Sequence, residues 1–81
     1  MSTLAVETHP LAQNVEFTDY DLVVSLVDGR KVIVPLVWFP RLSNAARSQL
    51  ENYELLGGGE GIHWPEIDED LGVEGLLRGT H

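Results

Sequence analysis

Residues 22–36, which read LVVSLVDGRKVIVPL, decide the fold. Two runs rich in β-branched residues flank an Asp-Gly pair, which is the strongest short-range signal of a β-hairpin. A two-residue turn would pair apolar with polar side chains. A three-residue loop over 27–29 instead places Gly29 in the left-handed position and pairs Val24 with Val32 and Leu22 with Val34. We therefore predict this register, which gathers apolar side chains on one face.

The second face of the hairpin is apolar as well, because it carries Val23, Val27 and Ile33. Strands that are apolar on both faces are typical of sheets covered on both sides. The chain has few helical residues with which to cover two faces. We expect the second face to be covered either by the termini and the last segment or by another protein.

Alternating polar and apolar residues before the hairpin predict a further strand, so the sheet is expected to be a meander of strands near 14–18, 22–28 and 31–37. Pro40 ends this region. Leu42, Ala46, Leu50 and Tyr53 then recur at spacings of four, four and three, which predicts one helix over 44–55. The glycines at 57–59 end that helix.

The rest of the chain predicts a short strand near 61–64, with Ile62 and Trp64 on the opposite side from His63, and a short helix near 73–78. The expected fold class is α+β. Residues 1–13 show no clear period and are expected to be a loosely ordered N-terminal arm. Residues 14–81 are expected to form a single small domain, since 81 residues leave no room for a second one.

The composition excludes several classes of function. The net charge of -8, from 13 acids and 5 scattered bases, disfavours nucleic acid, whose affinity depends on Lys and Arg. The absence of cysteine excludes disulfides, thiolate metal sites and Cys nucleophiles. No apolar run approaches the ~20 residues of a membrane helix. We expect a soluble cytoplasmic protein with no membrane association.

Residues 57–70, GGGEGIHWPEIDED, contain the most distinctive motif. A phosphate-binding loop needs a strand before it and a helix after it, whereas here the expected order is reversed and an acid sits among the glycines. A calcium loop starting at Asp68 fails because Gly72 stands at its fifth position instead of its sixth. We expect no catalytic residues, no cofactor and no metal site. The alternative is a weak metal-binding or small-molecule site at His63 and the acidic turn.

The large aromatic residues have two interpretations. Trp38, Phe39 and Trp64 either pack in the core or form an aromatic hot spot at a protein interface, with Arg41 beside them. The candidate protein interface predicted from the sequence consists of Trp38, Phe39, Arg41, His63 and Trp64.

Several of these segments resemble one family when taken in order. They are the Asp28-Gly29-Arg30 turn, VPLVWFPRL at 34–42, GGGEGIHWP at 57–65, IDEDL at 67–71 and VEGLL at 73–77. Together they resemble the short prokaryotic proteins of domain of unknown function 2442. The resemblance implies a three-stranded antiparallel sheet, a helix, a short strand and a final helical turn. It carries over no catalytic residues. It also implies an adjacent gene for another short protein, as in a toxin–antitoxin or similar two-gene module.

These observations favour a non-enzymatic protein–protein interaction module, such as the antitoxin-like or accessory member of a two-gene module. The apolar second face, the acidic surface and the thin core expected of so short a chain suggest a partner that is a small basic protein, and a homodimer is the other option. The alternative is a regulatory or nucleic-acid-associated module, for which a basic patch would be needed.

Overall fold

The computed structural model describes residues 10–79 and contains two three-stranded antiparallel sheets. The first sheet has the order β1-β2-β3, with β1 at Ala12–Phe17, β2 at Asp21–Leu26 and β3 at Lys31–Pro35. The second has the order β4-β5-β6, with β4 at Glu54–Leu56, β5 at Gly61–Trp64 and β6 at Glu69–Gly72. The helices are short: η1 at Leu36–Trp38, α1 at Pro40–Ser43, α2 at Arg47–Glu51 and α3 at Val73–Arg78.

The predicted hairpin register is confirmed. Val24 pairs with Val32, Leu22 with Val34, and Ser25 with Lys31. Gly29 has a φ of 99°, in the region that favours glycine, and the Leu26 N–H donates to the Arg30 carbonyl across the loop. The Asp28 carboxylate accepts from the Arg30 backbone N–H at 3.0 Å, which further fixes the turn.

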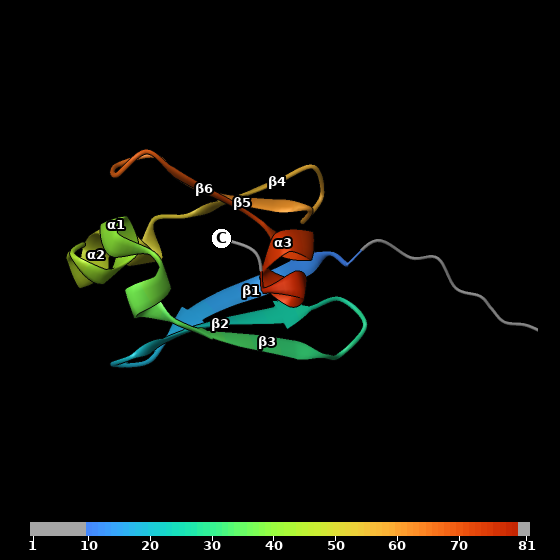
Figure 1. Ribbon diagram of the computed structural model, residues 1–81. Coiled ribbons are helices and arrows are strands. Elements are labelled where there is room, and N and C mark those ends of the chain that lie inside the picture. The colour runs from blue at the N-terminus through green and yellow to red at the C-terminus, as the bar shows by residue number, and fades with distance from the viewer. Residues whose placement is uncertain (1–9, 80–81) are drawn as a thin grey trace, which may run out of the picture.

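The two sheets form separate layers, with α1 and α2 at one end and α3 beside the layers at the other end (Figure 1). Burial alternates along β3, as in a half-buried strand, whereas three successive residues of β2, Leu22, Val23 and Val24, are buried. The core between the layers consists of Ala12, Val15, Leu22, Val24, Leu26, Val32, Val34, Leu36, Phe39, Leu42, Leu50, Ile62, Trp64, Val73 and Leu76.

The layers are joined along the edge of β1. The Ala12 N–H donates to the Gly59 carbonyl at 2.7 Å, and the Val15 N–H donates to the Tyr53 hydroxyl at 3.2 Å. Farther along the edge, Arg47 donates to the Phe17 carbonyl at 3.3 Å. These bonds satisfy backbone groups that an edge strand would otherwise leave unpaired. The sandwich is therefore closed on the β1 side.

The single helix predicted over 44–55 is wrong. Two short helices, α1 and α2, occupy 40–51, and the chain is extended at Ala46 (φ -72°, ψ 154°). The Gln49 side chain accepts from the Ala46 N–H at 2.9 Å and so stabilises the new helix start. Residues 54–56 form β4, because they pair with β5.

Other boundaries differ by a few residues. β1 begins at Ala12, two residues before the predicted strand, so the end of the predicted N-terminal arm belongs to the first sheet. Residues 1–9 of that arm lie outside the described residues. β3 ends at Pro35 instead of continuing to 37, and η1 begins at the next residue, Leu36. The short strand at 61–64 and the helix at 73–78 are confirmed.

The predicted α+β class is confirmed, although the second sheet has three strands where one was expected. The outer face of the first sheet has a different environment from the inner face. In the part of the chain that the structure describes, no helix or strand lies on the far side of this sheet (Figure 1). Of the apolar residues noted for the second face, Val27 and Ile33 are exposed, whereas Val23 is buried.

Candidate functional site

The structure separates the five residues of the predicted interface. Phe39 and Trp64 are buried in the core. The Trp64 Nε1–H donates to the Leu50 carbonyl at 2.9 Å, and its ring meets Phe17 edge-to-face at 6.2 Å between centroids. Ile62 is buried with Trp64 and His63 faces the other way, as the period of two predicts. Phe39 and Trp64 are therefore buried and stabilise the fold, and they do not form an exposed aromatic surface with His63.

Trp38 and Arg41 remain at the surface, but their side chains contact different parts of the molecule. The Trp38 side chain, 37% exposed, packs edge-to-face on Phe39 with 6.4 Å between the centroids. Arg41, at the start of α1, donates a hydrogen bond from Nη1 to the Asp68 carbonyl. Asp68 has a positive φ of 54°, so this bond holds the acidic turn in a conformation that few residues adopt.

His63 lies on the outer face of the second sheet in a row of three cross-strand neighbours, with Glu54 on β4 and Asp70 on β6. Its Nδ1 is hydrogen-bonded to Asp70 Oδ1. This hydrogen bond, followed by the charges of Asp70, Glu54 and Asp68, raises the pKa of His63 above its usual value. The arrangement is a hydrogen-bonded histidine–carboxylate pair on the outer face of the second sheet.

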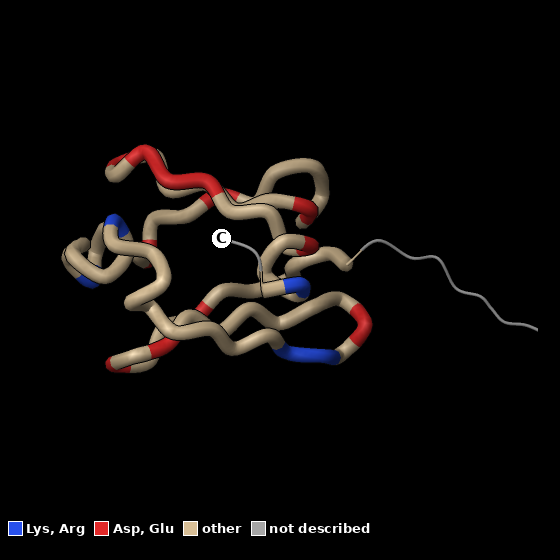
Figure 2. Tube along the Cα trace, in the orientation of Figure 1, with Lys and Arg blue, Asp and Glu red and all other residues tan. Residues whose placement is uncertain are grey.

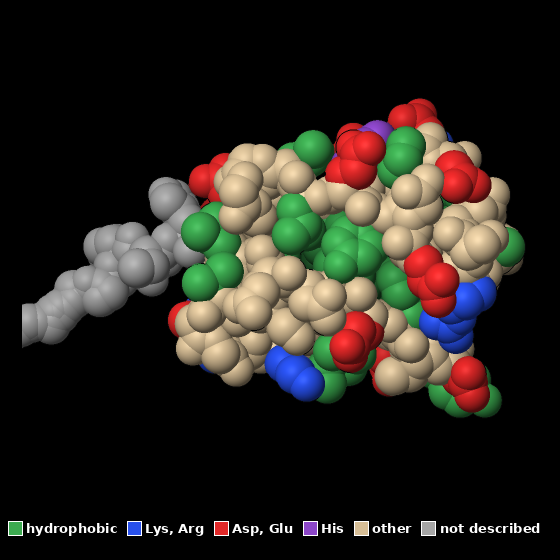
Figure 3. Space-filling model, turned by 180° about the vertical axis from the view of Figure 1, so that it is seen from behind, with side chains coloured by type: hydrophobic (Ala, Val, Ile, Leu, Met, Phe, Trp, Pro, Cys, Tyr) green, Lys and Arg blue, Asp and Glu red, His purple; other side chains and the backbone are tan. Residues whose placement is uncertain are grey.

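The alternative of a metal site at His63 lacks a set of ligands among the described residues. Within residues 10–79, no group of three or more His, Cys, Asp or Glu side chains is placed to hold a metal ion. The basic side chains also form no continuous patch on the face that Figure 3 shows, where hydrophobic side chains gather in the middle and acids lie around them. No helix among the described residues is long and apolar enough to cross a membrane.

Two surface features stand out instead. The first is the outer face of the first sheet, where Val23 pairs with Ile33 across β2 and β3. Ile33 is 61% exposed, and Tyr20 (80%) and Val37 (75%) are exposed at the end of the same sheet. The Leu36 N–H donates to the Tyr20 carbonyl at 2.8 Å, which holds the segments of Tyr20 and Val37 together. Val23 itself is buried, at 9% exposed, so the exposed apolar side chains are those of Tyr20, Ile33 and Val37. We call Tyr20, Val23, Ile33 and Val37 the outer-face patch.

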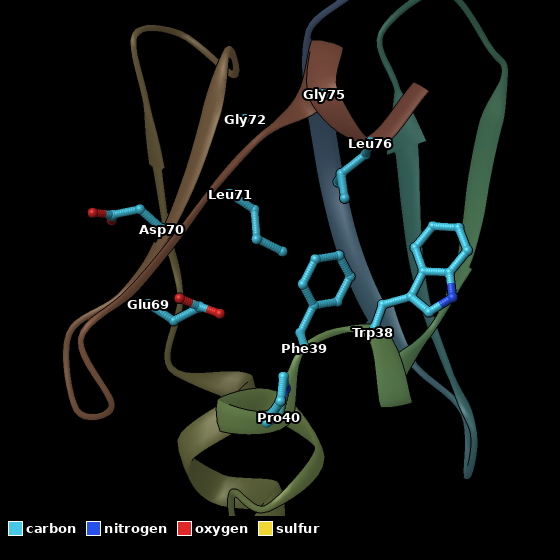
Figure 4. Close-up of a pocket in the computed structure, with 9 residues that line it drawn as sticks. All are labelled: Trp38, Phe39, Pro40, Glu69, Asp70, Leu71, Gly72, Gly75 and Leu76. Carbon is cyan, nitrogen blue, oxygen red and sulfur yellow. The ribbon is translucent and has the colours of Figure 1, made fainter. Parts of the chain in front are cut away.

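The second feature is a groove of about 410 Å³ on the side of the sandwich opposite β1. It lies between β6, η1 and α3, and its lining includes Trp38, Phe39, Leu71 and Leu76 (Figure 4). Phe39, Leu71 and Leu76 point toward one another there, while Asp70 points away.

Sequence reasoning found part of these features. The apolar second face was visible as Val23 and Ile33, but Tyr20 and Val37 lie outside regular strands and carry no periodic signal. The groove had no local signal, because residues far apart in the chain create it when β6 and α3 pack beside η1.

Comparison with known proteins gives a family and two structural relatives. A crystal structure of a protein of unknown function from Rhodospirillum rubrum ATCC 11170 is similar, with 31% identity, a TM-score of 0.78 and coverage of 90% of each chain. A solution structure of an uncharacterized protein from Chromobacterium violaceum shares the fold, with 22% identity and a TM-score of 0.72. That match covers 85% of this chain and 65% of the other. No curated protein matches. The model of the family described as "Protein of unknown function (DUF2442)" matches residues 12–81, and the chain belongs to this family.

Proposed function

We propose that this protein is a non-enzymatic protein-interaction module that binds a partner through the outer-face patch. The observation that carries the proposal is the exposure of Tyr20, Ile33 and Val37 on and beside one sheet face. Several large apolar side chains exposed in one region of a small domain are typical of an interaction site. The face is also rigid, because the β2–β3 ladder fixes the positions of Val23 and Ile33.

The charges around the patch support a basic partner. Glu16 stands beside Val23 in the same cross-strand row, and Asp19 and Asp21 lie at the turn end of the sheet. At the hairpin end, Arg30 is already paired with Asp28 at 2.8 Å, with Lys31 next to it. With a net charge of -8 on each copy, two copies repel one another, so a basic partner is favoured over a homodimer.

The His63–Asp70 pair supports a binding role more than catalysis. The pair lies on the outer face of the second sheet, and of its two members Asp70 lines the groove whereas His63 does not. A catalytic base needs a substrate site within hydrogen-bond reach. In the proposed setting, the protein is the cytoplasmic antitoxin-like or accessory member of a two-gene module, and its partner is a small basic protein.

The proposal is tested by capture from an extract of the source organism with matched bait proteins. The test variant is Ile33→Glu. The control is Leu56→Glu, which places the same charge on an exposed leucine (45%) of the second sheet. We expect wild type and Leu56→Glu to retain the same basic protein, identified by mass spectrometry, and Ile33→Glu to lose it. Retention by Ile33→Glu, or equal loss with both folded variants, would contradict the proposal.

A further inference from the structure

The side of the sandwich opposite β1 has an open strand edge. Among residues 10–79, β6 is the last strand of its sheet and pairs with β5 alone. The Val73 N–H donates to the Glu60 carbonyl at 3.0 Å, and this bond sets the phase of the β5–β6 ladder. Because hydrogen-bonded and non-hydrogen-bonded pairs alternate in an antiparallel ladder, the backbone N–H and C=O of Asp70 and the N–H of Gly72 point away from β5.

The groove lies along this edge. Phe39, Leu71 and Leu76 form its apolar floor, with Trp38 at one wall (Figure 4). The side chains of a strand laid beside β6 would alternate between two faces. One face is that of Glu69, Leu71 and the groove floor, and the other is that of Asp70. Opposite Leu71 it would therefore present an apolar side chain to the groove.

The charges along β6 define the other positions of such a strand. Acids run along β6 and the turn before it, including Glu66, Asp68, Glu69 and Asp70 (Figure 2). Glu69 lies at one end of the groove, toward Pro40 (Figure 4). Positions opposite Glu69 and Asp70 therefore favour basic side chains. A second copy of the chain would fit poorly, since pairing two β6 edges brings their acids together.

We propose that β6 and this groove bind an extended basic peptide segment of a partner protein by strand addition. The backbone groups of Asp70 and Gly72 supply main-chain hydrogen bonds, and the groove takes one apolar side chain. Two adjacent basic residues face Glu69 on one side of the strand and Asp70 on the other. This site is separate from the outer-face patch and goes beyond the function proposed above.

The probe for the test is the acetylated peptide Thr-Val-Arg-Arg-Val-Thr amide, whose sequence is the same in both directions and so suits either strand orientation. It is titrated into the full-length protein, observed by ¹H–¹⁵N NMR. We expect the largest shifts at the amides of Asp70 and Gly72 and at the Trp38 indole N–H, with the buried Trp64 indole as the internal reference. The same peptide with Glu in place of Arg should not bind.

Two further comparisons separate strand addition from simple charge attraction. Methylation of alternate peptide nitrogens removes main-chain donors and is expected to weaken binding at least about tenfold. Glu69→Lys should weaken binding by a similar factor, while Glu51→Lys, which changes the net charge equally but lies on α2, should have a much smaller effect. If Glu69→Lys is not folded, Glu69→Gln takes its place, with a smaller expected loss.

The proposal is overturned by any of three results. The first is no shift at Asp70 and Gly72 up to about 1 mM peptide, which corresponds to negligible affinity. The second is equal binding of the N-methylated peptide, and the third is equal weakening by Glu69→Lys and Glu51→Lys. Each of these leaves the outer-face patch untouched, because that surface is tested by Ile33→Glu. Conversely, failure of the Ile33→Glu test leaves the β6 groove standing.

Discussion

Some side chains stabilise the fold, whereas others of the same type lie at the surface. The two tryptophans show this division, because both belong to motifs that the sequence singles out. Trp64 is fully buried and holds the Leu50 carbonyl, whereas Trp38 is partly exposed beside the groove. One aromatic residue thus ties α2 to β5, and the other lines the groove.

Replacing the tryptophans by phenylalanine measures this difference. Trp64→Phe removes the donor to a buried carbonyl and leaves a small cavity, so we expect a loss of about 2–4 kcal/mol in the free energy of unfolding. Trp38→Phe, the matched control, is expected to cost about 1 kcal/mol or less. Urea denaturation of both variants gives the two values. Equal losses would show that the burial of Trp64 does not have the assigned role.

His63 supplies a pH-dependent contribution at the surface. Its pKa is raised in the folded protein, chiefly by the hydrogen bond to Asp70, so the folded state binds the proton more tightly than the unfolded state. The stabilisation is therefore fully present below the unfolded pKa of about 6.5 and is lost as pH rises through the raised value. Above the raised pKa, the imidazole ring of His63 is neutral and keeps only those interactions that do not need its positive charge.

The variant Asp70→Asn tests this pH dependence. We expect the decline of unfolding free energy as the pH rises above about 6.5 to be smaller in this variant than in wild type. Asp68→Asn also removes one negative charge, but Asp68 raises the pKa of His63 less than Asp70 does. The dependence of its unfolding free energy on pH should therefore stay near that of wild type. NMR titration of the assigned His63 ring gives an independent reading. Identical profiles for the two variants would rule out the pairing.

At the scale of elements, the sequence predicted what local pattern determines. The β2–β3 hairpin followed from its β-branched runs and from Asp28-Gly29, and the register was correct. α3 and β5 followed from similar local signals. The helix over 44–55 failed although its apolar spacing is real. Leu42 and Leu50 are both buried, but the chain reaches the two positions through separate helices with extended backbone at Ala46 between them.

The second sheet could not be predicted for a related reason. β4 has three residues, all exposed, and β6 has two acids followed by leucine and glycine, which is not a strand pattern. These strands exist because β5 pairs with both of them. Such pairing depends on long-range contacts that override weak local preference. Local sequence pattern therefore could not predict the groove beside β6. It also could not predict that the residues of the proposed aromatic interface lie in different parts of the structure.

The turn between β4 and β5 shows how one glycine joins the layers. Gly59 has a φ of 117°, and a Cβ there would lie 2.5 Å from the Ala12 carbonyl oxygen. Gly58, at a φ of 70°, has no atom within 4 Å of such a Cβ. Only the first position combines backbone strain with a clash against β1.

These two glycines provide a matched pair of variants. Gly59→Ala is expected to cost roughly 2–4 kcal/mol of unfolding free energy, from strain and from displacement of the β1 edge. Gly58→Ala should cost about 1–2 kcal/mol, from the left-handed backbone alone. Chemical denaturation measures both. A larger loss for Gly58→Ala would show that the contact between Gly59 and Ala12 does not join the layers.

The whole molecule has an acidic surface and an apolar sheet face that no described element covers. Its two sheets are joined along β1, where Tyr53, Arg47 and Gly59 occupy the edge. The opposite side has the open edge of β6 and its groove. The sheet face and the groove both lie on regular secondary structure, which places binding residues more precisely than loops do.

The most direct test of binding through the outer-face patch uses the three isoleucines of the chain. Ile33 is exposed on that face, Ile62 is buried in the core, and Ile67 is partly buried near the acidic turn. The δ1-methyl signals are followed by NMR while the basic protein captured by wild type is titrated in. We expect the Ile33 methyl to shift or broaden most, with Ile62 nearly unchanged. Complex formation that leaves the Ile33 methyl signal unchanged would contradict the account.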